Sequence, residues 1–191
     1  MEIVKLTPKI IVKAAEVLKK GGVVVFPTDT VYGLICDAYN KKSVEKIFKI
    51  KKRPKSKPLA IFAKDIKATE SMAFVDKNAI KKYWPGKYTI ILKLKPKIKL
   101  SRLVIKEDTI GVRVPKYKWL NNLFKRINKP LAQTSANISE KKATAKIKDV
   151  LNYFENKKHQ PDLIIDAGNL VKNKPSKIID LTNSKPKIIR N

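Results

Sequence analysis

Residues 21–34 read GGVVVFPTDTVYGL, an apolar run followed directly by a polar turn. The apolar run at residues 23–26 is bounded by glycine and proline, which predicts a strand buried on both faces. Two hydroxyls, a carboxylate and a phenol follow in residues 27–33. Ligand crevices of α/β sheets lie just beyond such strands, so this turn is a candidate binding site. A capped helix start is the alternative interpretation.

Helix and strand patterns alternate along the rest of the chain. A helix is predicted from Pro8, capped by Thr7, and further apolar stripes predict helices at residues 44–48, 80–84, 120–127 and 147–154. Strands are predicted at residues 58–63, 88–95, 110–114, 130–133, 163–165, 177–181 and 188–189. Several of these strands follow one another too closely for helical crossovers. We therefore expect one α/β (α+β) domain over residues 1–191, with a twisted mixed sheet flanked by helices.

The composition favours a cytoplasmic protein that meets polyanions. Forty-four basic and 16 acidic residues give a net charge of +28, which attracts nucleotides, tRNA or anionic membrane surfaces. No apolar run is long enough to cross a membrane or to serve as a secretory signal. The single cysteine, Cys36, excludes an internal disulfide and a zinc site built on cysteine pairs. His159, the only histidine, is predicted to be a solvated surface residue.

A phosphate site would have to be built from side chains. The six glycines show neither of the glycine-rich spacings that cradle phosphates. Residues 51–53, Lys-Lys-Arg, are the first candidates, although cations at a helix C-terminus also simply stabilise the helix. Small polar residues at 134–139 follow another predicted strand and could line a nucleotide or begin a helix. Arginines are scarce and therefore informative, since a guanidinium grips carboxylate and phosphate oxygens: Arg53, Arg102, Arg113, Arg126 and Arg190.

At these positions the chain resembles the YrdC-like family of threonylcarbamoyl-AMP synthases. Six segments are similar to elements of the family pattern. Residues 27–34 match P-T-[DE]-T-V-Y-G-L, residues 51–54 match K-x-R-P, and residues 84–89 match W-P-G-P-x-T. Residues 109–115 match T-x-x-V-R-x-P, residues 135–139 match S-A-N-x-S, and residues 176–180 match S-T-[IV]-[IV]-D. The resemblance implies a YrdC-like domain with a basic concave face. It also implies a nucleotidyltransferase that converts L-threonine, bicarbonate or CO2, and ATP into L-threonylcarbamoyladenylate and pyrophosphate. A separate complex would then transfer the group to tRNA.

The resemblance also implies which residues form the site. Those expected to face L-threonine are Thr30, Phe62, Arg113, Gln133 and Ser176. Those expected to face ATP are Lys51, Arg53, Lys57, Thr109, Ser135, Asn137, Ala143 and Arg190, with Lys51 and Arg53 as the catalytic cations. A magnesium ion is expected to bridge phosphate oxygens, and no protein metal site is predicted.

The chain departs from the family pattern at several of these positions. Phe62 replaces a histidine of many relatives, Lys57 an asparagine, Ala143 a serine and Glu140 a glycine, while residues 87–88 replace a proline-containing pair. Arg190 lies in a segment, residues 183–191, that is expected to be either a lid over ATP or a disordered tail.

Two other functions fit parts of the sequence. The net charge fits equally well a module that binds double-stranded RNA or tRNA without chemistry. A related enzyme that makes another carbamoyl adenylate would keep the fold and change the substrate. The polar turns at residues 27–33 and 134–139 favour an enzyme, because a surface that only follows phosphates does not need them.

Overall fold

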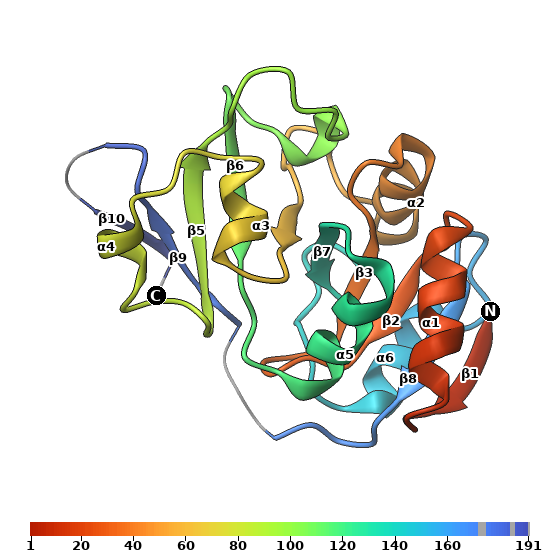
Figure 1. Cartoon of the computed structure of the whole chain (residues 1–191). Coiled ribbons are helices and arrows are strands. Elements are labelled where there is room, and N and C mark those ends of the chain that lie inside the picture. Colours follow the sequence, from red (N-terminus) through yellow and green to blue (C-terminus); the bar gives the residue numbers. More distant parts are fainter. Residues whose placement is uncertain (172–174, 184–185, 191) are drawn as a thin grey trace.

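The computed structural model describes residues 1–171, 175–183 and 186–190. Within them, one ten-stranded sheet has the order β1-β8-β2-β3-β7-β4-β6-β5-β9-β10 (Figure 1). The strands are β1 Glu2–Lys5, β2 Val24–Phe26, β3 Gly33–Asp37, β4 Ala60–Phe62, β5 Tyr88–Lys93, β6 Thr109–Arg113, β7 Leu131–Ser135, β8 Leu163–Asp166, β9 Lys177–Asp180 and β10 Lys187–Arg190. The helices are α1 Ile10–Lys19, α2 Lys41–Lys51, α3 Ile66–Glu70, α4 Lys77–Ile80, α5 Lys118–Ile127 and α6 Ile147–Phe154, with a 3-10 turn at Arg102–Val104.

The sheet is mixed, as the sequence predicts. β8 is parallel to both β1 and β2, β4 to β6, and β5 to β9, whereas the remaining neighbours are antiparallel. The β3–β7 register sets Gly33 opposite Ser135. As a result, the polar turn before β3 and the polar loop after β7 lie side by side at the same end of these two strands.

Two hydrophobic cores cover the two faces of the sheet. One contains Val25 of β2 with side chains of α2 and α6, such as Ile47 and Phe154. The other contains Val24 of β2 with side chains of α1 and α5, such as Leu18. Side chains that follow one another in β2 thus enter opposite cores, and the prediction of a strand buried on both faces is confirmed.

The alternative interpretation of the polar turns and several local predictions are wrong. Neither polar turn begins a helix: residues 27–32 are an irregular loop that leads into β3, and residues 136–146 form loops before α6. β3 and β1 were missed, because β3 follows the polar turn with no break and β1 is short and mostly exposed. α1 starts at Ile10 rather than at Pro8, although the Thr7 hydroxyl still accepts a hydrogen bond from the Ile10 amide at 3.3 Å.

No helix in the described ranges is long and apolar enough to cross a membrane.

The end of α2 offers a stability test at Lys52. This exposed residue is in the left-handed region, with φ of 52°, where a side chain is strained and glycine is not. Lys52→Gly should therefore raise the free energy of unfolding by about 0.5–1 kcal/mol, measured by urea denaturation. The matched control is Lys49→Gly, which places glycine within the helix and should lower stability by about 1 kcal/mol. Equal losses in both variants would contradict the expectation.

Candidate active site

A cavity of about 360 Å³ opens where the polar turn before β3, the loop after β7, and strands β4, β5, β6 and β9 meet. Predicted site residues from distant parts of the chain line this cavity together: Thr30, Arg53, Arg113, Gln133, Ser135, Asn137, Ala143, Ser176 and Arg190. The described lining contains arginine, lysine, hydroxyl and amide groups but no carboxylate. Such a cavity suits an anionic ligand.

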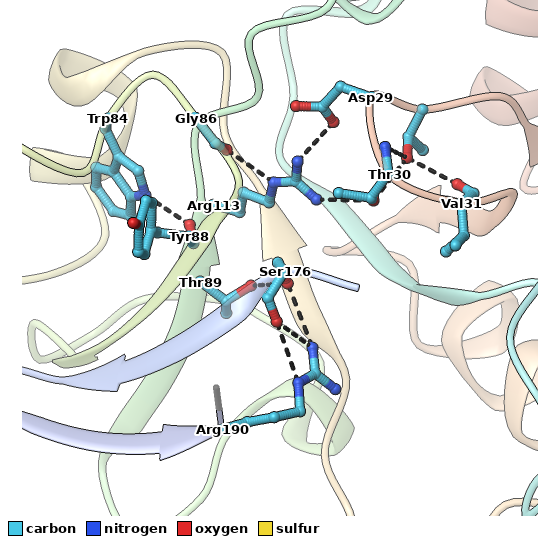
Figure 2. Close-up of polar contacts among 11 residues, drawn as sticks. Asp29, Thr30, Val31, Trp84, Gly86, Tyr88, Thr89, Arg113, Ser176 and Arg190 are labelled. Atoms are coloured by element: carbon cyan, nitrogen blue, oxygen red, sulfur yellow. Dashed lines mark hydrogen bonds and ion pairs between the residues drawn. The ribbon is translucent and has the colours of Figure 1, made fainter. Parts of the chain in front are cut away.

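Arg113, at the end of β6, is the best-anchored cation of the cavity (Figure 2). Its guanidinium donates hydrogen bonds to Gly86 O at 2.9 Å, to the Thr30 hydroxyl at 3.2 Å and to Asp29 at 2.5 Å. Its carbon Cζ lies 5.6 Å from the centre of the Phe62 ring. Burial lowers the pKa of Arg113, and Asp29 opposes that shift. Arginine stays charged in proteins, so the cation is rigidly placed with N–H groups left for a ligand carboxylate.

A chain of polar contacts joins β5, β9 and β10 at the opposite wall of the cavity. The Ser176 and Thr89 hydroxyls are 2.9 Å apart. Arg190, on β10, donates to Ser176 O from Nε at 3.1 Å and from Nη2 at 2.5 Å (Figure 2). Residues 187–190 therefore form a strand beside the cavity, and residues 184, 185 and 191 of the expected lid or tail lie outside the described residues.

Lys51 is buried and holds the loop that follows β7. Its ammonium nitrogen donates to Ser135 O at 2.7 Å, to Asn137 O at 2.7 Å and to Asn137 Oδ1 at 2.8 Å. Burial, together with the nearby Arg53 cation, lowers the pKa of Lys51 to about 7. In its charged form Lys51 directs all three ammonium hydrogens at protein oxygens, so in this arrangement it positions Asn137 and Ser135 rather than a phosphate.

Arg53 follows α2 and is fixed by its own loop. Its Nε donates to Lys57 O at 2.7 Å and its Nη2 to Pro58 O at 3.1 Å. Burial lowers its pKa. With one side of the guanidinium held by backbone oxygens, the rest can face the cavity that Arg53 lines.

Four predicted site residues do not line the cavity, namely Lys51, Lys57, Phe62 and Thr109. Lys57 is exposed, and its backbone oxygen rather than its ammonium contacts Arg53. The hydroxyl of Thr109 donates to Lys106 O. Thr109 begins β6 and Arg113 ends it, so the strand rise of about 3.3 Å per residue separates them by about 13 Å.

Thr89 and Lys141 are lining residues that the sequence analysis did not assign. The signal for Thr89 was present, since it closes the W-P-G-P-x-T-like element. Lys141 lies outside the quoted motifs, and only the fold brings it to the cavity. Lysines are too common in this chain for one of them to stand out.

The loop after β7 contains one of the departures from the family pattern, at Glu140. Glu140 has φ of 69°, in the left-handed region where glycine is favoured and where the family pattern has glycine. The buried hydroxyl of Ser139 has no hydrogen-bond partner among the described residues, while its amide donates to Lys51 O at 2.8 Å. Position 140 thus has a left-handed backbone without the glycine of the family pattern.

Within the described residues, no three His, Cys, Asp or Glu side chains form a metal site. Asp29 is the carboxylate beside the cavity, and it is engaged by Arg113. The donor set therefore does not fit a metal held by the protein.

The fold and the cavity together define a mixed-sheet α/β protein with a cationic, hydroxyl-lined cavity of a kind that suits an anionic ligand. The family model Sua5_yciO_yrdC, described as "Telomere recombination", matches residues 16–191. The chain belongs to this Sua5/YciO/YrdC family.

Relatives and solved structures extend this likeness. The protein is 37% identical over 180 residues to a putative threonylcarbamoyl-AMP synthase of Methanocaldococcus jannaschii, covering 91% of this chain and 83% of that protein. It is 34% identical over 189 residues to YciO of Escherichia coli K12, covering 95% and 88%. The structure of P. abyssi Sua5 complexed with L-threonine matches with a TM-score of 0.88 and 31% identity, over 99% of this chain and 56% of that one. The chain thus spans about half of that longer protein.

Proposed function

We propose that the chain is a threonylcarbamoyl-AMP synthase, which makes L-threonylcarbamoyladenylate and pyrophosphate from L-threonine, bicarbonate or CO2, and ATP. The observation that carries this proposal is the single cavity in which Arg113, held by Asp29 and Thr30, lies with Arg53, Arg190 and the hydroxyls of Ser135 and other residues. The synthase named among the relatives and the threonine complex of Sua5 support it.

In this proposal the two substrates divide the cavity. The carboxylate of L-threonine binds Arg113, and Ser176, Thr30 and Gln133 supply hydroxyl and amide contacts. ATP lies toward Arg53, Arg190 and the loop after β7, with magnesium on its phosphates. Lys51 keeps Asn137 and Ser135 in place for the nucleotide.

The chemistry needs positioning and charge more than a base. A carbamate oxygen attacks the α-phosphorus of ATP, the bond from that phosphorus to the bridging oxygen breaks, and pyrophosphate leaves with the electron pair. The carbamate forms first, when the neutral amine of L-threonine attacks the carbon of CO2 and loses one proton to solvent; bicarbonate takes up a proton and loses water to give the same CO2. The carbamate is then an anion, so no proton has to be removed from it in the adenylation step. The cations of the cavity lower the repulsion between two anionic substrates and stabilise the charge that moves to the leaving group.

The cellular setting follows from the product. An aminoacyl carbamate adenylate is an activated group donor, and we propose that a tRNA threonylcarbamoyl-transfer complex in the cytoplasm consumes it. Direct contact of this chain with tRNA or double-stranded RNA is a further part of the proposal, consistent with the net charge of +28. A non-catalytic RNA module and a related carbamoyl-adenylate-forming enzyme are the competing functions.

The test is pyrophosphate release from ATP, measured with and without L-threonine and bicarbonate, with the adenylate identified by mass spectrometry. We expect release only when all three substrates are present. Release with another carbamate donor and none with L-threonine would assign the related enzyme. If no pyrophosphate is released and the protein binds RNA in a salt-sensitive way, the chain is the non-catalytic RNA-binding module instead.

Arg53→Ala should reduce kcat on the order of a hundredfold or more, because Arg53 is proposed to stabilise charge on the transferring phosphates. The control is Lys55→Ala, which removes one positive charge two residues away from an exposed position. Lys55→Ala should retain near wild-type kcat. If the two variants behaved alike, Arg53 would act only through the overall field of the protein.

A further inference from the structure

A second cavity, of about 420 Å³, lies on the far side of the loop that follows β7. The end of α2, this loop and the end of α6 enclose it, and we call it the lysine groove. Its floor is apolar or aromatic, with Ile50, Ile138 and Tyr153. Its described polar lining consists of ammonium, amide and imidazole groups: Lys49, Lys52, Lys141, Asn152, Asn156, Lys157, Lys158 and His159. No carboxylate is among them.

One loop separates the lysine groove from the active-site cavity. Lys141 lines both cavities. On the active-site side, the Asn137 amide donates to Lys141 O. On the groove side, the Tyr153 hydroxyl donates to Lys142 O at 3.0 Å. The backbone of this wall is therefore fixed from both sides, whereas the Lys141 side chain is exposed and can reach either cavity.

The charge of the groove is not neutralised by the described residues. Ion pairs of the described residues involve Lys13, Lys41, Lys46, Lys77, Lys129 and Arg113, none of which lines the groove. The basic cavity near Lys97, in contrast, contains Asp108. Placement at a helix C-terminus accounts for Lys49 at the end of α2. It does not account for Lys141, which lies in the wall loop.

After the proposed reaction the active-site cavity holds two anions, the adenylate and pyrophosphate. Its volume of about 360 Å³ is near the lower end for ligand sites and has to hold an adenylate with its amino-acid group. Pyrophosphate and the adenylate are both anions, so they repel each other in the shared cavity until one of them leaves. The lysine groove, which shares Lys141 with this cavity, contains several further cations.

We propose that the lysine groove binds inorganic pyrophosphate and is the exit site for the leaving group. The inference rests on the proposed function. On this exit route, pyrophosphate leaves Arg53, binds the Lys141 ammonium and then binds Lys157 and Lys158. No bond forms or breaks in this step.

The test is a pyrophosphate titration followed by backbone amide NMR shifts, which does not need catalysis. We expect saturable shifts at Asn152, Tyr153 and Asn156 in the wild type. The triple variant Lys141→Gln, Lys157→Gln, Lys158→Gln should bind pyrophosphate at this site about tenfold more weakly, since three exposed contacts are removed. The control removes the same charge from exposed positions around α1: Lys9→Gln, Lys19→Gln, Lys20→Gln. It should retain the shifts.

Turnover supplies the second readout. If release from the groove follows chemistry, the triple variant should lose several-fold in kcat with little change in KM for L-threonine. Pyrophosphate shifts confined to residues of the active-site cavity would overturn the proposal. So would groove shifts caused by ATP and not by pyrophosphate, because they would show that the groove holds bound nucleotide instead. Inactive protein with normal groove shifts would count against the proposed function alone.

Discussion

Arg113→Met should lower kcat/KM for L-threonine about a thousandfold, because it removes the cation proposed to hold the substrate carboxylate. It should also destabilise the protein by about 3–5 kcal/mol, since the Asp29 side chain, only 10% exposed, is left without its partner. Denaturant unfolding and steady-state kinetics measure the two effects.

A double variant separates these effects. Asp29→Asn with Arg113→Met removes both charges, so most of the lost stability should return while activity stays low. Recovery of activity together with stability would show that Arg113 supports the fold and does not bind the substrate.

Lys51→Met should lower both stability and activity. The substitution leaves the oxygens of Ser135 and Asn137 without the ammonium that now donates to them, at a cost of about 2–4 kcal/mol. KM for ATP should rise, because the loop proposed to hold ATP loses its anchor. A normal KM for ATP in the folded variant would contradict the positioning role.

The stability of the wild type should also depend on pH through Lys51. Its pKa is about 7 in the folded protein and about 10.4 when unfolded, so between these values the unfolded chain binds more protons. Wild-type stability should therefore rise from pH 7 to pH 10 more steeply than that of Lys51→Met. Urea denaturation of both proteins at several pH values measures the difference, and parallel curves would contradict it.

The sequence could predict the mixed sheet and most of the cavity lining, because the apolar patterns of strands are followed directly by segments that match the family pattern. Residues 27–34 and 135–139 carry a signature and follow strands, and Thr30, Ser135 and Asn137 line one cavity. Their contacts with ligands stay a prediction. Although β3 was missed, the position predicted for the turn was right, because β3 continues directly from the turn.

The direction of long side chains could not be predicted in the same way. Lys51 and Arg53 are two residues apart, yet one points into the protein and the other lines the cavity. The oxygens that accept hydrogen bonds from Lys51 belong to the end of β7 and the loop after it. That segment is far from Lys51 in the sequence, so the contact could not be predicted from neighbouring residues. Thr109 belongs to a motif with Arg113, but the extended strand carries the two apart.

The contacts that assemble the site join remote parts of the chain. Asp29 and Arg113 are 84 positions apart, Lys51 and Asn137 are 86 apart, and Thr89 and Ser176 are 87 apart. Closing such long loops is slow, so these contacts should form late in folding, after the barrier is largely crossed. If ATP and L-threonine are the substrates, as proposed, either one bound would then retard unfolding and leave the refolding rate nearly unchanged, so its presence would lengthen the lifetime of the folded protein.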